Sequence, residues 1–363
     1  MQCYSGKTIL ITGHTGFKGS WLCAWASTLG ARVVGLSDNI PTTPSNFDVS
    51  KIGGLVEEYR TDIRDTQAVK KIILDTQPDF IFHLAAQALV RPSYESPLDT
   101  ISTNALGTAN ILDALRFLDK QIVAIMITSD KAYDNKEWLW GYRETDSIGG
   151  KDPYSASKGM AELVIRSYVE SFFNKSQNVL VGVARAGNVI GGGDWAADRI
   201  VPDCVKAASK RAELLIRNPL ATRPWQHVLE PLSGYLSLGD ELSKNSDLHG
   251  EAFNFGPSAD QNHPVSSLIN EMAKYWDQIS WVDDSNINQK VYEAGLLKLN
   301  CDKANIKLKW QPTMQFEETV YMTVNWYKNY YINETKSMSE FTLAQIEEYS
   351  NLARNRNIEW AIK

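Results

Sequence analysis

Short apolar runs alternate with longer amphipathic stretches through the first half of the chain. The apolar runs predict strands at residues 7–12, 31–37, 56–62, 79–85, 122–129 and 178–185. The stretches between them predict helices at about 17–29, 65–76, 98–118 and 153–174. Most of the runs are continuously apolar, which is typical of parallel strands buried on both faces. This rhythm predicts an α/β fold built on a doubly wound parallel sheet.

The rhythm changes after Arg185, where segments rich in glycine, proline and tryptophan begin, such as GGGDWAADRIVPD and NPLATRPWQHV. Segments of this composition are typical of loops around a site. The tail at 339–355 carries apolar residues at roughly helical spacing. It predicts a helix packed on the body of the protein, with a partner surface as the alternative.

The bulk composition narrows the class of protein. The 363 residues can bury a substantial core, and 43% hydrophobic with 22% charged residues indicate a globular chain. A net charge of −6 argues against a nucleic-acid or acidic-membrane partner, because phosphate backbones are bound by concentrated positive charge. An anionic small molecule needs only a local positive site.

The cysteines and the apolar runs predict the cellular compartment of the protein and whether it binds a metal. The four cysteines are isolated, which favours reduced thiols and predicts no metal site: Cys3, Cys23, Cys204 and Cys301. The chain passes almost at once into a strand-like run, which leaves no room for a signal peptide. Its apolar runs fall short of the ~20 residues of a membrane span. We expect a cytoplasmic protein with no membrane partner.

The segment TGHTGFKGS places Gly13, Gly16 and Gly19 directly after the first predicted strand and at the start of a helix. Glycine permits a sharp turn and a close approach to a pyrophosphate, whose charge the helix N-terminus stabilises. The context predicts a Rossmann-like dinucleotide site, with a purely structural turn as the alternative. Lys18 precedes Gly19 instead of following it before a Ser or Thr, so this is not a P-loop. His14, inside the loop, is placed to touch the cofactor.

Two acidic residues follow the next two strands. Asp38 lies near the end of the second strand, where an acid binds an adenosine ribose and favours NAD over NADP. A plain turn role in SDN is equally consistent. Asp62 follows the third strand and is a candidate to bind the adenine. A helix N-cap role within TDIRD is equally consistent.

Two groups of reactive side chains stand out. Ser129, Asp130 and Lys131 end the fifth predicted strand, and Tyr154 and Lys158 form a Tyr-x-x-x-Lys pair on the next helix. Tyrosine, with a pKa of about 10, is a poor base at neutral pH, but a lysine one helical turn away favours the phenolate. Adjacent strand residues point to opposite faces, so the first group meets at one site only if a turn begins there. The alternatives without a catalytic role are a charged strand end for the first group and an ordinary helix for the second.

The chain resembles the extended short-chain dehydrogenase/reductase family over nearly its whole length, both in the sequence of its segments and in their order. The matching segments are TGHTGFKGS, TDIRD, HLAAQ (83–87), NALGT (104–108), TSDK (128–131), YSASK (154–158), RAGNVIGGGDW (185–195), RPWQHV (223–228) and FNFG (253–256). The resemblance implies NAD as the cofactor and a nucleotide sugar as the substrate. It implies an NAD-binding domain at 1–185 and mainly a substrate-binding lobe at 186–363, interleaved with late strands of the sheet.

The resemblance also implies roles for single residues. Tyr154 would take a proton from a sugar hydroxyl, Lys158 would lower the tyrosine pKa and contact the nicotinamide ribose, and Ser129 would hydrogen-bond the same hydroxyl. The residues expected to bind the cofactor are Gly13, His14, Gly16, Phe17, Gly19, Asp38, Asp62, Ile63, Leu84, Ala85, Gln87, Tyr154 and Lys158.

Within the family, the chain looks like a nucleotide-sugar 4,6-dehydratase. Oxidation at C4 acidifies the C5 proton, and loss of water then needs a base at C5 and an acid at the C6 hydroxyl. The resemblance makes Asp130 the acid, which must stay protonated in a desolvated pocket. Lys131 stands where the dTDP-glucose enzymes carry a Glu base, which favours the CDP-sugar branch, with CDP-glucose as the expected substrate. Either burial lowers the Lys131 pKa, which we favour, or Lys131 orients a water or another base.

The sequence supports two other functions less well. A 4-epimerase or 4-reductase would need Tyr154 and Lys158 but neither Asp130 nor Lys131. A binding protein that had lost catalysis would be expected to lose part of the Tyr–Lys pair, and both residues are present.

The nucleotide sugar brings a diphosphate, which needs donors in a locally positive pocket. Arg223 and Arg199 are candidates, although a surface salt bridge is equally consistent for Arg199. Asn188 is a diphosphate or sugar contact by resemblance, and Asp194 joins it as a substrate candidate. Trp195 either stacks on the base or fills the core of the lobe.

Other residues in the matching segments have structural roles in our interpretation. Asn104 holds the active-site strand through backbone contacts, His83 ends an apolar strand, and Trp225 packs in the core. The predicted helices at 98–118 and 153–174 pair in family members into the four-helix bundle of a dimer. The resemblance therefore implies a homodimer or a dimer of dimers.

Overall fold

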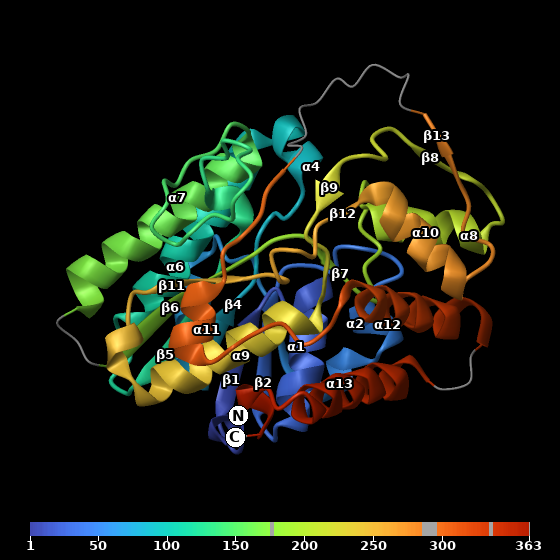
Figure 1. Ribbon diagram of the computed structural model, residues 1–363. Coiled ribbons are helices and arrows are strands. Elements are labelled where there is room, and N and C mark those ends of the chain that lie inside the picture. The colour runs from blue at the N-terminus through green and yellow to red at the C-terminus, as the bar shows by residue number, and fades with distance from the viewer. Residues whose placement is uncertain (175–177, 285–295, 334–336, 363) are drawn as a thin grey trace.

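The centre of the protein is a seven-stranded parallel sheet (Figure 1). The computed structural model describes residues 1–174, 178–284, 296–333 and 337–362. The strands, in spatial order β11-β6-β5-β4-β1-β2-β3, are β1 (Thr8–Thr12), β2 (Arg32–Ser37), β3 (Val56–Arg60), β4 (Phe80–His83), β5 (Ile122–Ile127), β6 (Val179–Ala186) and β11 (Ala252–Phe255). All six predicted strands are present, and the doubly wound parallel sheet is confirmed.

Burial along the strands follows their place in the sheet. Every residue of the central strands β4, β5 and β6 is buried, as their continuous apolar sequences require. The edge strand β3 exposes Glu57 and Glu58, which explains why its sequence is more polar. The seventh strand, β11, comes from the second half of the chain and pairs with β6.

Helices cover both faces of the sheet (Figure 1). One face packs against α3 (Thr66–Thr76), α6 (Gly107–Leu115) and α7 (Pro153–Tyr168). The other packs against α1 (Phe17–Thr28), α9 (Leu229–Lys244), α12 (Phe316–Lys328) and α13 (Met338–Asn355). The chain runs from β1 outward through β2 and β3, then returns to β4 on the other side of β1. Ligands of such sheets bind where the strand order reverses, at the carboxyl ends.

The two long predicted helices are helical over nearly their full length but contain π-helical segments. The first consists of α5 (Pro97–Ile101), the π segment η3 (Ser102–Leu106) and α6, and its last residues, 116–118, form a turn. The second continues from α7 into the π segment η5 (Val169–Phe173).

The second half of the chain adds short strand pairs and further helices. The pairs are β7 (Val189–Ile190) with β10 (Gln226–His227), β9 (Thr222–Arg223) with β12 (His263–Pro264), and β8 (Leu214–Ile216) with β13 (Trp281–Asp283). The remaining helical elements within the described residues are η1 (Gln2–Tyr4), α2 (Asn46–Val49), η2 (Ile52–Leu55), α4 (Val90–Glu95), η4 (Asp130–Ala132), α8 (Ile200–Ser209), η6 (Ser246–Leu248), α10 (Val265–Tyr275), α11 (Asp302–Leu308), η7 (Asn329–Asn333) and α14 (Glu359–Ile362).

The tail forms α13 and packs on α1. Ser337 and Glu340 form a capping box at its N-terminus. Tyr349 is fully buried and meets Trp25 of α1 edge to face, with ring centroids 5.7 Å apart. The regularly spaced apolar residues of the tail therefore pack in the core.

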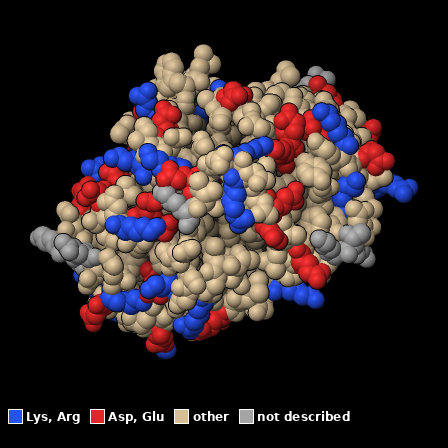
Figure 2. Space-filling view, turned by 60° about the horizontal axis from the view of Figure 1, so that its bottom comes forward, with Lys and Arg blue, Asp and Glu red and all other residues tan. Residues whose placement is uncertain are grey.

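On the face displayed in Figure 2, positive and negative side chains are interspersed, which agrees with the small net charge. Among the described residues, no helix is both long and apolar enough to cross a membrane.

Candidate active site

A large cavity lies at the carboxyl ends of β1, β2, β4 and β5. The N-terminus of α7 and two loops of the second half, 187–199 and 217–225, form its other walls. Its volume is about 1630 Å³. Pockets for one small ligand measure about 300–1,000 Å³, so this cavity has room for two ligands.

The glycine loop forms one end of the cavity. Gly13 has a φ of +72°, and a Cβ there would lie 2.8 Å from the backbone nitrogen of Ala85. A Cβ on Gly19 would lie 2.0 Å from the Gly13 carbonyl oxygen. Gly16 is the N-cap of α1 and has no side chain with which to cap it, and Gly16 and Phe17 line the cavity. The first N–H groups of α1 can therefore bind an anion, as a dinucleotide pyrophosphate requires.

His14 lies elsewhere than we expected. Its side chain is fully buried beneath β2, where a Cβ on Gly35 would lie 2.5 Å from the imidazole ring. Its Nε2 is 3.2 Å from the Glu58 carboxylate, and its ring meets Phe47 edge to face. Burial lowers the pKa of His14. The imidazole therefore packs between the glycine loop and the sheet. His14 is not among the residues that line the cavity, and its contact with a cofactor stays a prediction.

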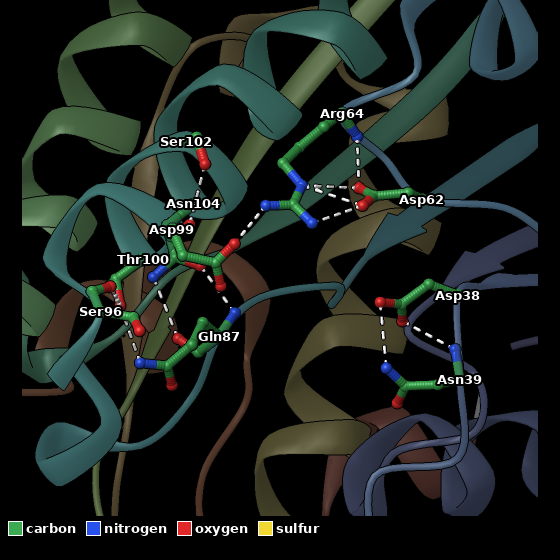
Figure 3. A network of polar contacts seen from close by, with 10 residues as sticks. All are labelled: Asp38, Asn39, Asp62, Arg64, Gln87, Ser96, Asp99, Thr100, Ser102 and Asn104. Carbon is green, nitrogen blue, oxygen red and sulfur yellow. Dashed lines mark hydrogen bonds and ion pairs between the residues drawn. The ribbon is translucent and has the colours of Figure 1, made fainter.

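Asp38 follows β2 directly and lines the cavity (Figure 3). The side chain is exposed, and its carboxylate accepts hydrogen bonds from the backbone N–H of Asn39 at 2.8 Å and from the Asn39 side chain at 3.1 Å. The turn role considered for Asp38 is therefore present, and its contact with an adenosine ribose stays a prediction.

Asp62 lines the same end of the cavity (Figure 3). Its carboxylate binds the guanidinium and the backbone N–H of Arg64, and these hydrogen bonds lower its pKa. Arg64 also binds Asp99 on α5. The N-cap of α3 is Asp65, so the capping role considered for Asp62 falls to the later aspartate.

The loop after β4 forms a wall of the cavity through Leu84, Ala85 and Gln87, with Ile63 beside it. Asn104 accepts a hydrogen bond from the Gln87 backbone N–H at 2.8 Å and donates to the Gln87 carbonyl at 3.0 Å (Figure 3). The Gln87 side chain donates to Thr100 and to its own loop. The polar groups of Gln87 thus shape the loop. Asn104 has a structural role through backbone contacts, as expected, but it holds the loop after β4 rather than the active-site strand.

The Ser129–Asp130–Lys131 group begins a turn. Ser129 is the N-cap of η4: its Oγ accepts a hydrogen bond from the Lys131 backbone N–H at 3.2 Å and donates to the Asp130 carboxylate at 2.9 Å. This turn removes the strand alternation that would have separated the side chains, and all three residues line the cavity.

Asp130 and Lys131 differ in burial. Asp130 is 4% exposed, and burial raises its pKa against the opposing charge of Lys131 and the Ser129 hydrogen bond. This is the environment that an acid protonated near neutrality requires. Lys131 is half-buried. Deep burial, the premise of the base role we favoured, is therefore not present.

Tyr154 and Lys158 project from the first turns of α7, where Pro153 is the first helical residue and Asp152 caps the Ser155 N–H at 2.9 Å. Both side chains are buried and line the cavity. Burial raises the pKa of Tyr154 to about 12, opposed by a hydrogen bond with Ser129. Burial lowers the pKa of Lys158 to about 8, opposed by Glu162.

Lys18 is a cation of this site that the sequence interpretation missed. It lines the cavity from the first turn of α1. Burial lowers its pKa to about 8, and the charges of Arg199, Asp130 and Lys158 act on it. Its place next to Gly19 in the glycine loop was the signal that could have identified it, because that loop lines the cavity.

The candidate substrate residues lie on the walls formed by the second half. Arg199 donates to Asp194 at 2.8 Å beside Tyr154, inside the cavity and not on the outer surface. Asn188 and Arg223 also line the cavity. Trp195 is 3% exposed and donates from its indole to Tyr331 at 2.9 Å, so most of its ring packs in the core.

The comparison with known proteins identifies the family. A family model described as GDP-mannose 4,6 dehydratase matches residues 10–323. The chain belongs to this family. The 4,6-dehydratase match spans the glycine loop, the turn at Ser129, the Tyr–Lys pair and most of the second half of the chain.

Two curated relatives are also dehydratases. A CDP-glucose 4,6-dehydratase of Salmonella typhimurium is 44% identical over 330 residues, which cover 90% of this chain and 91% of the relative. A dTDP-glucose 4,6-dehydratase of Xanthomonas campestris pv. campestris is 24% identical, with 88% of this chain and 93% of the relative covered.

Several solved structures have the same fold as this protein. The epimerase Mth375 of Methanothermobacter thermautotrophicus superposes with a TM-score of 0.76 at 23% identity, covering 91% of this chain and 94% of the other. The UDP-glucuronic acid 4-epimerase of Bacillus cereus, in complex with UDP-glucuronic acid and NAD, gives 0.76 at 21% identity, covering 89% and 100%. The expected resemblance to the extended short-chain dehydrogenase/reductase fold is confirmed.

Proposed function

We propose that this protein is an NAD-dependent nucleotide-sugar 4,6-dehydratase, which converts CDP-D-glucose to CDP-4-dehydro-6-deoxy-D-glucose and water in deoxysugar biosynthesis. One observation carries the proposal: the turn of Ser129, Asp130 and Lys131 lines the same cavity as Tyr154 and Lys158. This arrangement occurs in a chain 44% identical to a CDP-glucose 4,6-dehydratase. A 4-epimerase would need only the Tyr–Lys pair.

The glycine-loop end of the cavity fits NAD. The first turn of α1 would hold the pyrophosphate, and Asp38 and Asp62 would hold the adenosine. The apolar wall of Ile63, Leu84 and Ala85 would support the adenosine end. When bound, NAD supplies the hydride acceptor for sugar C4 and the hydride donor for C6.

The first half of the reaction uses Tyr154 as the base for the C4 hydroxyl, and Ser129 hydrogen-bonds the same oxygen. Because burial holds the tyrosine pKa at about 12, positive charge must stabilise its phenolate. Lys158 lies one turn away, and the charge of Arg199 acts directly on Tyr154.

The second half eliminates water across C5 and C6. Buried Asp130 donates a proton to the departing C6 hydroxyl. Lys131, from the adjacent position of the same turn, takes the C5 proton or orients the group that does so. Lys18 and Arg199 add positive charge close to Asp130 and Tyr154 respectively, where charge changes during the reaction.

The nucleotide sugar would lie against the loops of the second half. Arg223 and Arg199 are the donors proposed for the diphosphate, with Asn188 and Asp194 beside the sugar. In this assignment residues 1–185 mainly bind the cofactor and residues 186–363 mainly bind the substrate.

We also propose that the enzyme acts in the cytoplasm as a homodimer or a dimer of dimers. Large apolar side chains that are exposed on the α5–α6 and α7 helical runs support pairing through these helices: Leu98, Leu106, Phe117, Leu163 and Phe172. Sedimentation of a species of one chain mass at working concentration would contradict the dimer.

The activity is tested by incubating the purified protein with NAD and, separately, CDP-, dTDP-, UDP- and GDP-glucose. We expect CDP-glucose to lose the mass of one water with no net reduction of NAD. Loss of water from another nucleotide sugar alone would correct the nucleobase. Loss from none of the four would overturn the dehydratase, and an isomer of unchanged mass would favour the epimerase.

A further inference from the structure

A buried ion pair lies directly behind the catalytic side chains. Glu162 of α7 and Arg185 of β6 are 7% and 4% exposed. The guanidinium donates from Nε to one carboxylate oxygen at 2.8 Å and from Nη2 to the other at 2.9 Å. Such a two-pronged pair fixes the orientation of both side chains. It also has a desolvation cost, so pairs of this kind need a reason beyond stability.

The same carboxylate joins the two catalytic elements. Glu162 lies one helical turn after Lys158 on α7. Its Oε1 accepts a hydrogen bond from the hydroxyl of Thr128 at 2.5 Å, and Thr128 immediately precedes Ser129 at the end of β5. One buried group therefore connects the strand end that carries Ser129 and Asp130 to the helix that carries Tyr154 and Lys158.

The connection continues into the second half of the chain. Arg185 also donates to the Tyr133 hydroxyl at 2.7 Å, and that hydroxyl donates to Asn254 of β11 at 2.8 Å. Asn254 is fully buried and donates in turn to the backbone carbonyl of Tyr142 at 2.9 Å. The turn that begins at Ser129 is thus held from β6 and from β11.

The charged and titratable groups that act on Lys158 can be named element by element. Lys18 faces it from α1 and His83 from β4, and Glu162 lies on its own helix. Burial has lowered the pKa of His83 to about 3, so His83 carries no charge near neutrality. Lys18 repels the ammonium and Glu162 attracts it.

We propose that Glu162 is a positioning residue of the dehydratase: it fixes the Ser129 turn relative to Tyr154 and Lys158, and it keeps Lys158 charged during C4 oxidation. The inference rests on the proposed function. The Glu162 carboxylate has two separate effects. Its hydrogen bond from Thr128 fixes the position of the Ser129 turn, and its negative charge acts on Lys158.

The test isolates C4 oxidation with CDP-6-deoxyglucose. This sugar has no C6 hydroxyl to lose, so the C4 alcohol becomes a ketone, its proton passes through Tyr154 to solvent, and reduced cofactor accumulates and is read by absorbance. Initial rates are measured from neutral to alkaline pH for the full-length wild type and variants. Thermal unfolding of each variant shows whether it is folded.

We expect Glu162→Gln to shift the alkaline limb of the pH–rate profile to a pH lower by roughly one unit. At a fixed pH on that limb, this shift corresponds to a roughly tenfold loss of rate. Glu170→Gln is the matched control, because Glu170 continues the same helical run but is exposed and pairs with Arg166. Thr128→Val should lower the rate several-fold at every pH without moving the limb. Thr128→Ser keeps the donor and should retain the wild-type rate.

A folded Glu162→Gln variant with the wild-type profile would overturn the inference. If that variant does not fold because Arg185 is left unpaired, the Thr128 variants decide: equal rates for Thr128→Val and Thr128→Ser would overturn it. Failure of the wild type itself to remove water from any nucleotide sugar would instead overturn the proposed function.

Discussion

At the scale of single residues, burial moves the catalytic groups in different directions. It raises the pKa of Asp130, raises that of Tyr154 to about 12, and lowers that of Lys158 to about 8. The proposed reaction needs a protonated aspartate, which burial favours. It also needs a phenolate and an ammonium, which burial opposes and which nearby charge must restore.

Asp130→Asn tests the acid. The amide matches the carboxyl in shape but cannot deliver the proton, so we expect water loss to fall by roughly 10²–10⁴-fold while C4 oxidation continues. Reduced cofactor should then accumulate with CDP-glucose, as measured by absorbance. Equal losses of oxidation and elimination would contradict a role confined to the elimination.

The pH dependence of wild-type elimination has a defined sign. The protonated form of Asp130 is active and its pKa is raised, so elimination should be full below that pKa and decline as the pH rises through it. Loss of one water from CDP-glucose, measured by mass in single turnovers across pH, checks the direction. A rate that rises steadily with pH would contradict this assignment.

Lys131 is tested by exchange of the C5 proton with deuterated water. If Lys131 is the base, Lys131→Ala should slow exchange by roughly 10²-fold or more. Lys131→Glu, which supplies the base type of the dTDP-glucose enzymes, should recover part of it. Exchange at the full rate in Lys131→Ala would exclude Lys131 as the base and leave the orienting role.

At the scale of elements, the start of α7 positions the Tyr–Lys pair. Pro153 fixes the first helical φ, and Asp152 binds Ser155 through its backbone N–H and, at 2.6 Å, its hydroxyl. Tyr154 directly follows Pro153, so the cap determines where the helix begins and where the phenol is placed.

Asp152→Ala should lower the free energy of unfolding by about 1 kcal/mol, the usual loss for an N-cap. It should also slow C4 oxidation, because the first turn of α7 would fray at Tyr154. Asp152→Asn keeps an N-capping oxygen and is the matched control. Denaturant unfolding and the oxidation assay on the same samples check both effects, and an alanine variant as stable as the asparagine variant would contradict the cap's contribution.

At the scale of the whole molecule, Glu230 joins elements that are far apart in sequence. It lies in the first turn of α9 and is 1% exposed. Its carboxylate accepts hydrogen bonds from the backbone N–H groups of Thr313 and Met314 and from the Tyr349 hydroxyl of α13. The C-terminal helix is therefore attached to the body through a buried acid.

This acid predicts a pH dependence of stability. Burial raises the pKa of Glu230 to about 7, above its ordinary value of 4.5, so the folded state binds the proton more tightly than the unfolded state. The contribution of this proton is full below pH 4.5 and is lost as the pH rises to about 7, by an amount on the order of 3 kcal/mol. Relative to wild type, Glu230→Gln should therefore gain stability over this range in denaturant unfolding. A constant difference would contradict the shifted pKa.

The framework could be predicted from the sequence because it depends on local patterns. Continuous apolar runs specify buried parallel strands, and Gly19 of TGHTGFKGS is required by a contact within its own turn, with the carbonyl of Gly13. The Tyr154–Lys158 spacing is fixed by one helical turn. These features need no knowledge of distant contacts.

The side chains whose positions depend on distant contacts could not be placed in this way. His14 is inside the glycine loop by sequence, but the space beneath Gly35 and the Glu58 carboxylate draw its ring into the sheet. Arg199 pairs with Asp194 on its own loop, but only the packed fold places that loop beside Tyr154 of α7. Lys131 is half-buried, although Asp130 beside it is buried.

The sequence by itself determined the strand and helix succession, the dinucleotide-type loop and the presence of both reactive groups, because periodicity and short spacings encode them. Only the tertiary structure decided that η4 turns Asp130 and Lys131 into the cavity of Tyr154, and that Glu162, Thr128 and Arg185 hold the two groups together. Burial and hydrogen bonding between residues far apart in the chain are properties of the packed fold, and they set both the geometry and the pKa values of the site.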